Sequence, residues 1–187
     1  MSLKSSTLKL TESKESSGCV SESPNCPCGY KQFNFTESIK CLKFVGQEKP
    51  ELGNVCNNEH GGYLPLPLND EENAEYFAAF NTFPLSTSMD SESPNNGNGV
   101  ILGLYDLFSP GNYTTVTDEM TPLYFNWNTA VDEPDNGGCC IGGWHLRAEN
   151  FVVMLTTAPE STPNALGTWN DFPGYEFFNL VCEADSI

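Results

Sequence analysis

Eight cysteines lie in a chain of only 187 residues. A short chain with so many cysteines is typical of an oxidising compartment, where disulfides staple a small domain together. Two N-x-S/T sequons, at Asn34 and Asn112, fit the same compartment, and both asparagines are candidate N-glycosylation sites. The sequence therefore indicates a secreted, extracellular protein.

The charge of the chain is strongly negative and unevenly distributed. The formal net charge is −17, and from Glu51 onward Arg147 is the only basic residue against twenty Asp and Glu. A surface with this charge repels phosphate backbones, which excludes nucleic acid as a partner and disfavours anionic membranes. No apolar run reaches the roughly 18–20 residues of a membrane span, so we expect no membrane insertion. Carboxylates are the ligands that calcium prefers, and a divalent cation is the natural counter-charge.

The length of the chain fits one folded domain with a tail. Residues 1–25 are rich in Ser, Lys and Glu and are interpreted as an N-terminal tail or stalk, and residues 26–187 as the domain. The start of the chain has no signal-peptide pattern, so we expect the sequence of a mature form. Hydrophobic residues make up 39% and aromatic residues 12% of the chain, which is enough for a packed core.

Alternating and helical patterns along the chain predict an α+β fold. Asn69 can cap a helix that runs to about Phe80, because the three acidic residues that follow the cap suit the helix dipole. A shorter helix is expected from Glu48 to Glu59, with a Gly-Gly stop after it. Strands are predicted at residues 29–35, 40–45, 63–68, 100–104, 151–155 and 177–182.

Three short loop segments combine carboxylate and amide side chains, namely residues 132–136, residues 149–150 and residues 169–171. Calcium takes about 6–8 oxygen ligands, and separate loops of this kind can supply them. From composition alone, solvated acidic loops are the more frequent explanation of such segments. The pair Glu133 and Asp135 does not predict a glycosidase, because carboxylates two residues apart cannot readily flank a sugar bond from opposite sides.

Short motifs follow one another along the chain in the order Cys26-Pro27-Cys28-Gly29-Tyr30, Val55-Cys56 with Gly61-Gly62-Tyr63-Leu64, Ile101-Leu102-Gly103-Leu104, Phe125-Asn126-Trp127 with Glu133-Pro134-Asp135, Gly167-Thr168-Trp169-Asn170-Asp171, and Val181-Cys182-Glu183. With this order and spacing, the chain from about Cys26 to Glu183 resembles a long-form C-type lectin-like domain. One core position departs from the family pattern, since Ile101 stands where the W-I-G-L motif has Trp. The resemblance implies two helices packed on small antiparallel sheets, stapled by disulfides, with a long calcium-binding loop region.

Carried over position by position, the resemblance implies a calcium site formed by Glu133, Asp135, Glu149, Asn170 and Asp171. It also implies a cis peptide bond between Glu133 and Pro134. The placement of Glu149 rests on the Glu-Asn-x-Val-Val-Met pattern that starts there, because ten residues look inserted just before it. A second family site matches only partly and would use Asp106, Asn136 and Asn150.

The same resemblance pairs Cys26 with Cys41 and Cys56 with Cys182. In the resembled fold the chain termini lie at the pole opposite the calcium loops. The remaining Cys19 and Cys28 would then lie too far from the loop cysteines, because bridged Cα atoms lie within about 7 Å of each other. We therefore expect a Cys19–Cys28 bond and a vicinal Cys139–Cys140 bond. Two thiols or an intermolecular link are the alternative for the vicinal pair.

The function implied by the resemblance is calcium-dependent carbohydrate binding, in which vicinal sugar hydroxyls complete the coordination of Ca²⁺. Glycans or glycoconjugates are the expected partners, and a homo-oligomer would supply multivalency because such single sites are weak. The calcium ligands Glu133, Asp135, Glu149 and Asn170 would also contact sugar, and further candidates for this contact are Cys139, Cys140 and Trp144. The Glu-Pro-Asp sequence mixes the family's mannose-type and galactose-type patterns, which leaves the stereochemistry of the sugar open. We expect no enzymatic activity, and the alternative function is a calcium-independent interaction or structural module on the same fold.

Overall fold

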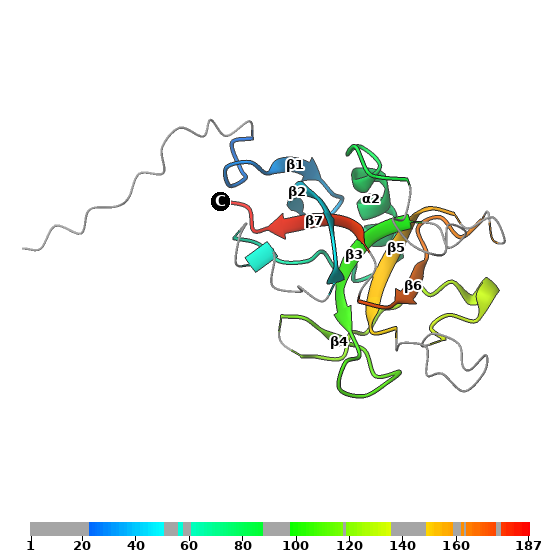
Figure 1. Ribbon diagram of the computed structural model, residues 1–187. Coiled ribbons are helices and arrows are strands. Elements are labelled where there is room, and N and C mark those ends of the chain that lie inside the picture. Colours follow the sequence, from blue (N-terminus) through cyan, green and yellow to red (C-terminus); the bar gives the residue numbers. More distant parts are fainter. Residues whose placement is uncertain are drawn as a thin grey trace, which may run out of the picture.

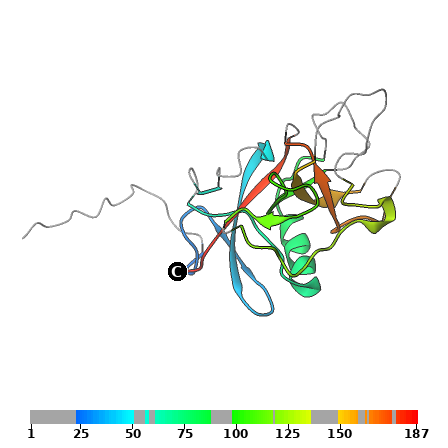
Figure 2. The same ribbon diagram turned by 90° about the horizontal axis from the view of Figure 1, so that it is seen from below.

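The computed structural model describes residues 23–50, 56–57, 61–87, 98–117, 119–135, 149–158, 162, 164–174 and 177–187. A β-sheet forms its centre, and helix α2 (Asp70–Phe80) packs against one face of that sheet (Figures 1 and 2). The C-terminus lies at one end of the molecule, and the loop of residues 128–135 lies at the opposite end in both views. Near the C-terminus, Ile187 N donates a hydrogen bond to Asn25 O at 2.9 Å, which joins the two ends of the described chain.

The strands of the sheet are β1 (Lys31–Asn34), β2 (Ile39–Glu48), β3 (Asn98–Tyr105), β4 (Thr114–Thr115), β5 (Phe151–Thr157), β6 (Trp169–Phe172) and β7 (Phe178–Ala184). Their order is β1-β2-β7-β3-β5-β6, and β4 pairs with β3. The last strand, β7, lies in the middle, antiparallel to β2 and parallel to β3. The prediction of small antiparallel sheets is therefore wrong for the described strands, which form one mixed sheet because β7 pairs with its two neighbours in opposite senses.

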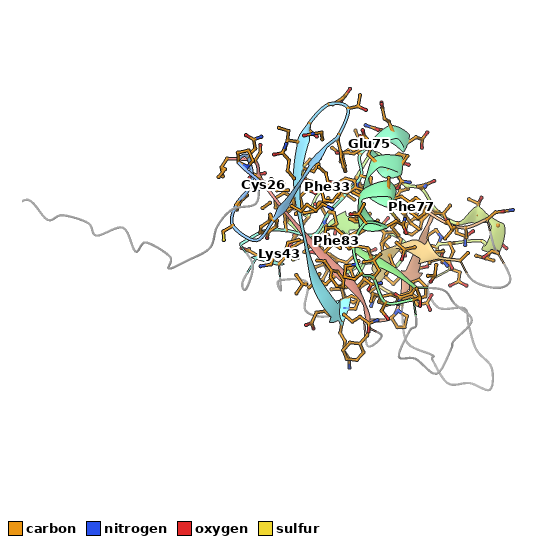
Figure 3. All side chains as sticks on the ribbon, turned by 90° about the horizontal axis from the view of Figure 1, so that it is seen from above. Cys26, Phe33, Lys43, Glu75, Phe77 and Phe83 are labelled. Carbon is orange, nitrogen blue, oxygen red and sulfur yellow. A yellow bond between two sulfur atoms is a disulfide. The ribbon has the colours of Figure 1, made fainter. Side chains whose placement is uncertain are left out.

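Apolar side chains cover both faces of the sheet, because successive residues of a strand point to opposite faces. On one face the strands pack against Tyr76 and Phe80 of α2. Phe33 of β1 also faces Phe83, just after the helix, with ring centroids 5.7 Å apart (Figure 3). The opposite face carries a second cluster that includes Leu155 and Leu180. The two clusters hold the sheet between the helix and the disulfides.

Both framework disulfides that the resemblance implied are present, Cys26–Cys41 and Cys56–Cys182. The first has a sequence separation of 15 and the second a separation of 126. Cys28 is disulfide-bonded as well, but its predicted partner Cys19 lies outside the described residues. The Cys19–Cys28 pairing therefore stays a prediction.

Glu183, in the closing Val181-Cys182-Glu183 motif, is buried between helix α2 and the sheet. The Glu183 carboxylate accepts a hydrogen bond from the Tyr76 hydroxyl and forms an ion pair with Lys40 at 3.2 Å. Burial raises the pKa of Glu183, and its hydrogen bond with Tyr76 and the charge of Lys40 oppose that rise. This network joins β7, β2 and α2 through one side chain, so we interpret Glu183 as a structural residue.

Helix α2 begins as the sequence predicts. Asn69 has extended backbone angles, and its side-chain oxygen accepts a hydrogen bond from Glu72 N at 2.8 Å. Glu72 reaches back and accepts from Leu68 N at 2.8 Å, so two amide groups at the helix start are satisfied by side chains. Three acidic residues in the first turn add a favourable interaction with the helix dipole.

Replacing the cap, Asn69→Ala, is expected to lower the free energy of unfolding by about 1 kcal/mol, because the Glu72 amide loses its acceptor. Urea unfolding followed by circular dichroism measures the change. Asn69→Ser is the matched control, since serine keeps an acceptor oxygen at the cap and should stay near the wild-type value. An equal loss in both variants would show that the acceptor oxygen at the cap is not the source of the stability.

Two predicted elements differ from the structure. Glu48 belongs to strand β2, and of the helix expected up to Glu59 only residues 56–57 are described, with helical backbone. Residues 63–68 do not form a strand, and only Tyr63 makes an isolated bridge, to Glu183. Pro65 and Pro67 in this segment have no amide hydrogen, so they cannot continue a ladder of hydrogen bonds.

Among the described residues, no helix is both long enough and apolar enough to cross a membrane.

Candidate metal site

Two separate segments bring the candidate ligands together at the end of the molecule opposite the C-terminus. Strand β6 carries Asn170 and Asp171, which pair with Val153 and Val152 of β5 and are therefore fixed by the sheet. The loop that follows the short 3₁₀ helix η2 (Thr129–Val131) carries the other two, Glu133 and Asp135. The Glu133-Pro134 peptide bond is cis, as the resemblance implied.

The carboxylates of Glu133, Asp135 and Asp171 form a compact cluster. One oxygen from each side chain lies within 4.8 Å of the others. Asp135 N donates to Asp171 Oδ1 at 3.2 Å, which joins the loop to the strand. Asn170 Nδ2 donates to Glu133 Oε1 at 2.6 Å, so the amide of Asn170 also contacts the cluster.

The carboxylates in this cluster repel one another when they are ionised. Burial, which is the largest cause, raises the pKa of Glu133 to about 9 together with a hydrogen bond with Asp171 and the negative charges of Asp171, Asp135 and Glu149. Near neutral pH the protein without a cation therefore keeps a proton on Glu133. A cation between these groups would remove both the mutual repulsion and the need for that proton.

Two polar atoms of the cluster, Asn170 Oδ1 and, when Glu133 is ionised, Glu133 Oε2, are buried and accept no hydrogen bond among the described residues. A buried oxygen without a partner is costly, because it has lost water and gained nothing in exchange. Both are oxygens of the kind that coordinate calcium, one a carboxylate and the other an amide carbonyl. The set of donors therefore fits a hard divalent cation such as Ca²⁺.

Only some of the predicted site residues lie together in the structure. Four of them, Glu133, Asp135, Asn170 and Asp171, lie together. Glu149 lies just before β5, outside the three-carboxylate cluster, and acts on Glu133 through its charge. The other candidates for sugar contact, Cys139, Cys140 and Trp144, lie outside the described residues, as does Asn136 of the second family site.

The remaining residues of interest near the site are aromatic or buried. Trp169 is fully buried and donates from Nε1 to Asn73 Oδ1 at 2.8 Å, which makes it a core residue. Asp106 is also buried, and its Oδ2 accepts from Gly111 N at 2.6 Å. Sequence reasoning missed Tyr113, which donates a hydrogen bond to Asp171 from a distant segment. The sequence around Tyr113 shows only that it lies inside a sequon, which does not indicate a contact with Asp171.

Comparison with solved structures shows the fold of the chain. The human scavenger receptor C-type lectin carbohydrate-recognition domain matches with a TM-score of 0.58 at 24% identity, covering 86% of this chain and 98% of that domain. The cow CD23 C-type carbohydrate-recognition domain, solved in the presence of a GlcNAc2Man3 oligosaccharide, matches with a TM-score of 0.57 at 26% identity, covering 87% and 98%. A calcium-independent type II antifreeze protein matches with a TM-score of 0.53 at 15% identity, covering 87% and 95%.

The chain therefore has the C-type lectin-like fold, stapled by two disulfides in its described part. The likeness shows the fold, and the absence of enzymatic activity stays an expectation from sequence. No protein-family model matches the sequence, and no curated protein matches it.

Proposed function

We propose that this protein binds carbohydrate in a calcium-dependent manner, with the cation held by Glu133, Asp135, Glu149, Asn170 and Asp171. The observation that carries the proposal is the pair of orphaned buried oxygens, Glu133 Oε2 and Asn170 Oδ1, beside a cluster of three carboxylates. Such an arrangement is costly for a protein that holds no cation there. A bound Ca²⁺ would satisfy both oxygens at once.

Each residue of the site would make a different contact with the sugar. When bound, the cation supplies a positive centre that takes two neighbouring sugar hydroxyls into its coordination shell. Carboxylate oxygens of Glu133 and Asp135 can accept hydrogen bonds from those hydroxyls. Asn170 Nδ2, which donates to Glu133 Oε1 at 2.6 Å, can donate to a hydroxyl oxygen instead. Cys139, Cys140 and Trp144 stay proposed further contacts to the sugar.

The partners that we propose are extracellular glycans or glycoconjugates. A site of this kind contacts few sugar atoms, so a single site binds weakly, and a homo-oligomer would raise the affinity through multivalency. The disulfides of the described chain support a secreted protein. Asn34, at the end of β1, and Asn112 are both exposed, so both sequons are accessible to the N-glycosylation that we propose for them.

Two of the similar structures support this proposal, since they are C-type carbohydrate-recognition domains. The antifreeze protein with the same fold is calcium-independent, so the fold alone does not require the metal. A calcium-independent interaction or structural module is therefore the alternative. Melting temperature and a glycan array, each measured with calcium and with chelator, separate the two. If neither the melting temperature nor the glycan profile changed with calcium, the calcium-independent module would be favoured.

Asp171→Asn is expected to weaken calcium binding by more than about 100-fold, because changes to residues that only support metal ligands already cost about 10- to 100-fold. Isothermal titration measures the calcium affinity. Glycan binding at about 1 mM calcium, a concentration near the dissociation constants of extracellular calcium modules, should be lost in the variant. Glu71→Gln is the matched control, because it also removes one negative charge but lies exposed on α2. A variant that kept wild-type calcium affinity would contradict the assignment of Asp171.

A further inference from the structure

Tyr113 is buried beside the candidate calcium site. It immediately precedes β4, far in sequence from the candidate ligands, and its side chain is only 3% exposed. Its hydroxyl donates to Asp171 Oδ2 at 2.7 Å, and Asp171 itself is 1% exposed. A hydrogen bond between two buried groups is stronger than the same bond in water, because the surrounding dielectric constant is low.

Aromatic rings fix the position of the Tyr113 side chain. Its ring centroid lies 4.8 Å from that of Trp127 and 6.5 Å from that of Phe125. Burial raises the pKa of Tyr113 well above its usual range, and the hydrogen bond to Asp171 and the nearby negative charges raise it further. The rings thus hold the Tyr113 hydroxyl in place to donate to Asp171.

The Asp171 carboxylate is held at both of its oxygens. Oδ2 accepts from the Tyr113 hydroxyl at 2.7 Å, and Oδ1 accepts from the backbone of Asp135 at 3.2 Å. Each carboxylate oxygen has two lone pairs, so each can accept one such bond and still face a cation. The two donors belong to two separate segments and bond to different oxygens, which fixes the rotation of the carboxylate in the absence of metal.

We propose that Tyr113 is a positioning residue for the calcium site, which holds the carboxylate of Asp171 oriented toward the cation that the proposed function requires. The inference rests on that proposed function, because Tyr113 acts through a ligand and does not contact sugar. Its contribution is to keep Asp171 ordered before binding, so that the cation does not have to immobilise it.

The variant Tyr113→Phe removes the hydroxyl and keeps the ring against Trp127. We expect isothermal titration to find calcium affinity lowered by about 10- to 100-fold, the usual effect of losing a residue that orients a ligand. Tyr63→Phe is the matched control, because Tyr63 makes the same kind of bond, to Asp185 Oδ1 at 2.9 Å, near the C-terminus at the other end of the molecule. The control should bind calcium as the wild type does.

The outcomes separate the inference from the function beneath it. Wild-type protein that bound no calcium would overturn both. Wild-type protein that bound calcium, with Tyr113→Phe and Tyr63→Phe equal to it, would overturn the role of Tyr113 and leave the proposed function standing. At saturating calcium, glycan affinity should be unchanged in Tyr113→Phe, because the variant weakens only the step that loads the cation.

A second measurement needs only wild-type protein, so it does not depend on how well the variant folds. A cation at Asp171 draws electron density from the carboxylate and weakens it as an acceptor for the Tyr113 hydroxyl. We therefore expect calcium to produce a saturable tyrosine signal in the near-ultraviolet difference spectrum, with the same midpoint as the titration. Calcium binding without that signal would overturn the inference.

Discussion

Removal of the Cys56–Cys182 disulfide, by changing both residues to alanine, is expected to lower the free energy of unfolding by about 5 kcal/mol. The bridge joins residues 126 positions apart, and loop-closure entropy gives about this value for a loop of that length. Domains of this size are stable by only about 5–15 kcal/mol, so the variant should be largely unfolded at 37 °C. Urea unfolding at low temperature measures the loss.

The second framework disulfide is the internal comparison for this result. Cys26–Cys41 has a sequence separation of 15, for which the same entropy argument gives about 3 kcal/mol. Both pairs of cysteines are buried, so the alanine variants differ mainly in the length of the loop that is released. If removal of Cys26–Cys41 cost as much as removal of Cys56–Cys182, loop length would not explain the contribution of the long-range bridge.

The parts of the fold that sequence predicted well are those with local causes. The cap at Asn69 and the acidic first turn predict α2 within one residue, because the bonds that start a helix connect residues three or four positions apart. Strands β3, β5 and β7 were found from runs of apolar residues, with ends that differ by a few positions. The two disulfides and the cis bond at Glu133-Pro134 came from the resemblance, because no local rule predicts them.

The parts that sequence missed depend on long-range packing. Nothing in the apolar run of β7 indicates that it pairs with β2 on one side and β3 on the other. The contact between Tyr113 and Asp171 joins residues 58 positions apart, and a tyrosine inside a sequon looks like an exposed loop residue. A position in a family motif predicts which residues hold a ligand, but the residues that support them depend on packing particular to each chain.

In the absence of calcium, the stability of the protein is expected to fall as the pH rises from about 4.5 to about 9. Burial and the neighbouring carboxylates together raise the pKa of Glu133 from 4.5 to about 9 in the folded protein. Between these two values the folded protein holds a proton that the unfolded chain has released, so a rise in pH favours unfolding. The slope is at most about 1.4 kcal/mol per pH unit for one proton. Melting temperatures in chelator at several pH values measure it, and Glu133→Gln should flatten the curve.

Calcium should reverse this dependence, because the cation binds the ionised form of Glu133 and displaces its proton. Apparent calcium affinity is therefore expected to rise by up to about tenfold per pH unit over the same range, and binding at pH 7 should release about one proton. Isothermal titration in two buffers with different enthalpies of ionisation counts that proton directly. Binding that released no proton at pH 7 would contradict the role of Glu133, since a carboxyl group with a pKa near 9 cannot coordinate a cation there without losing its proton.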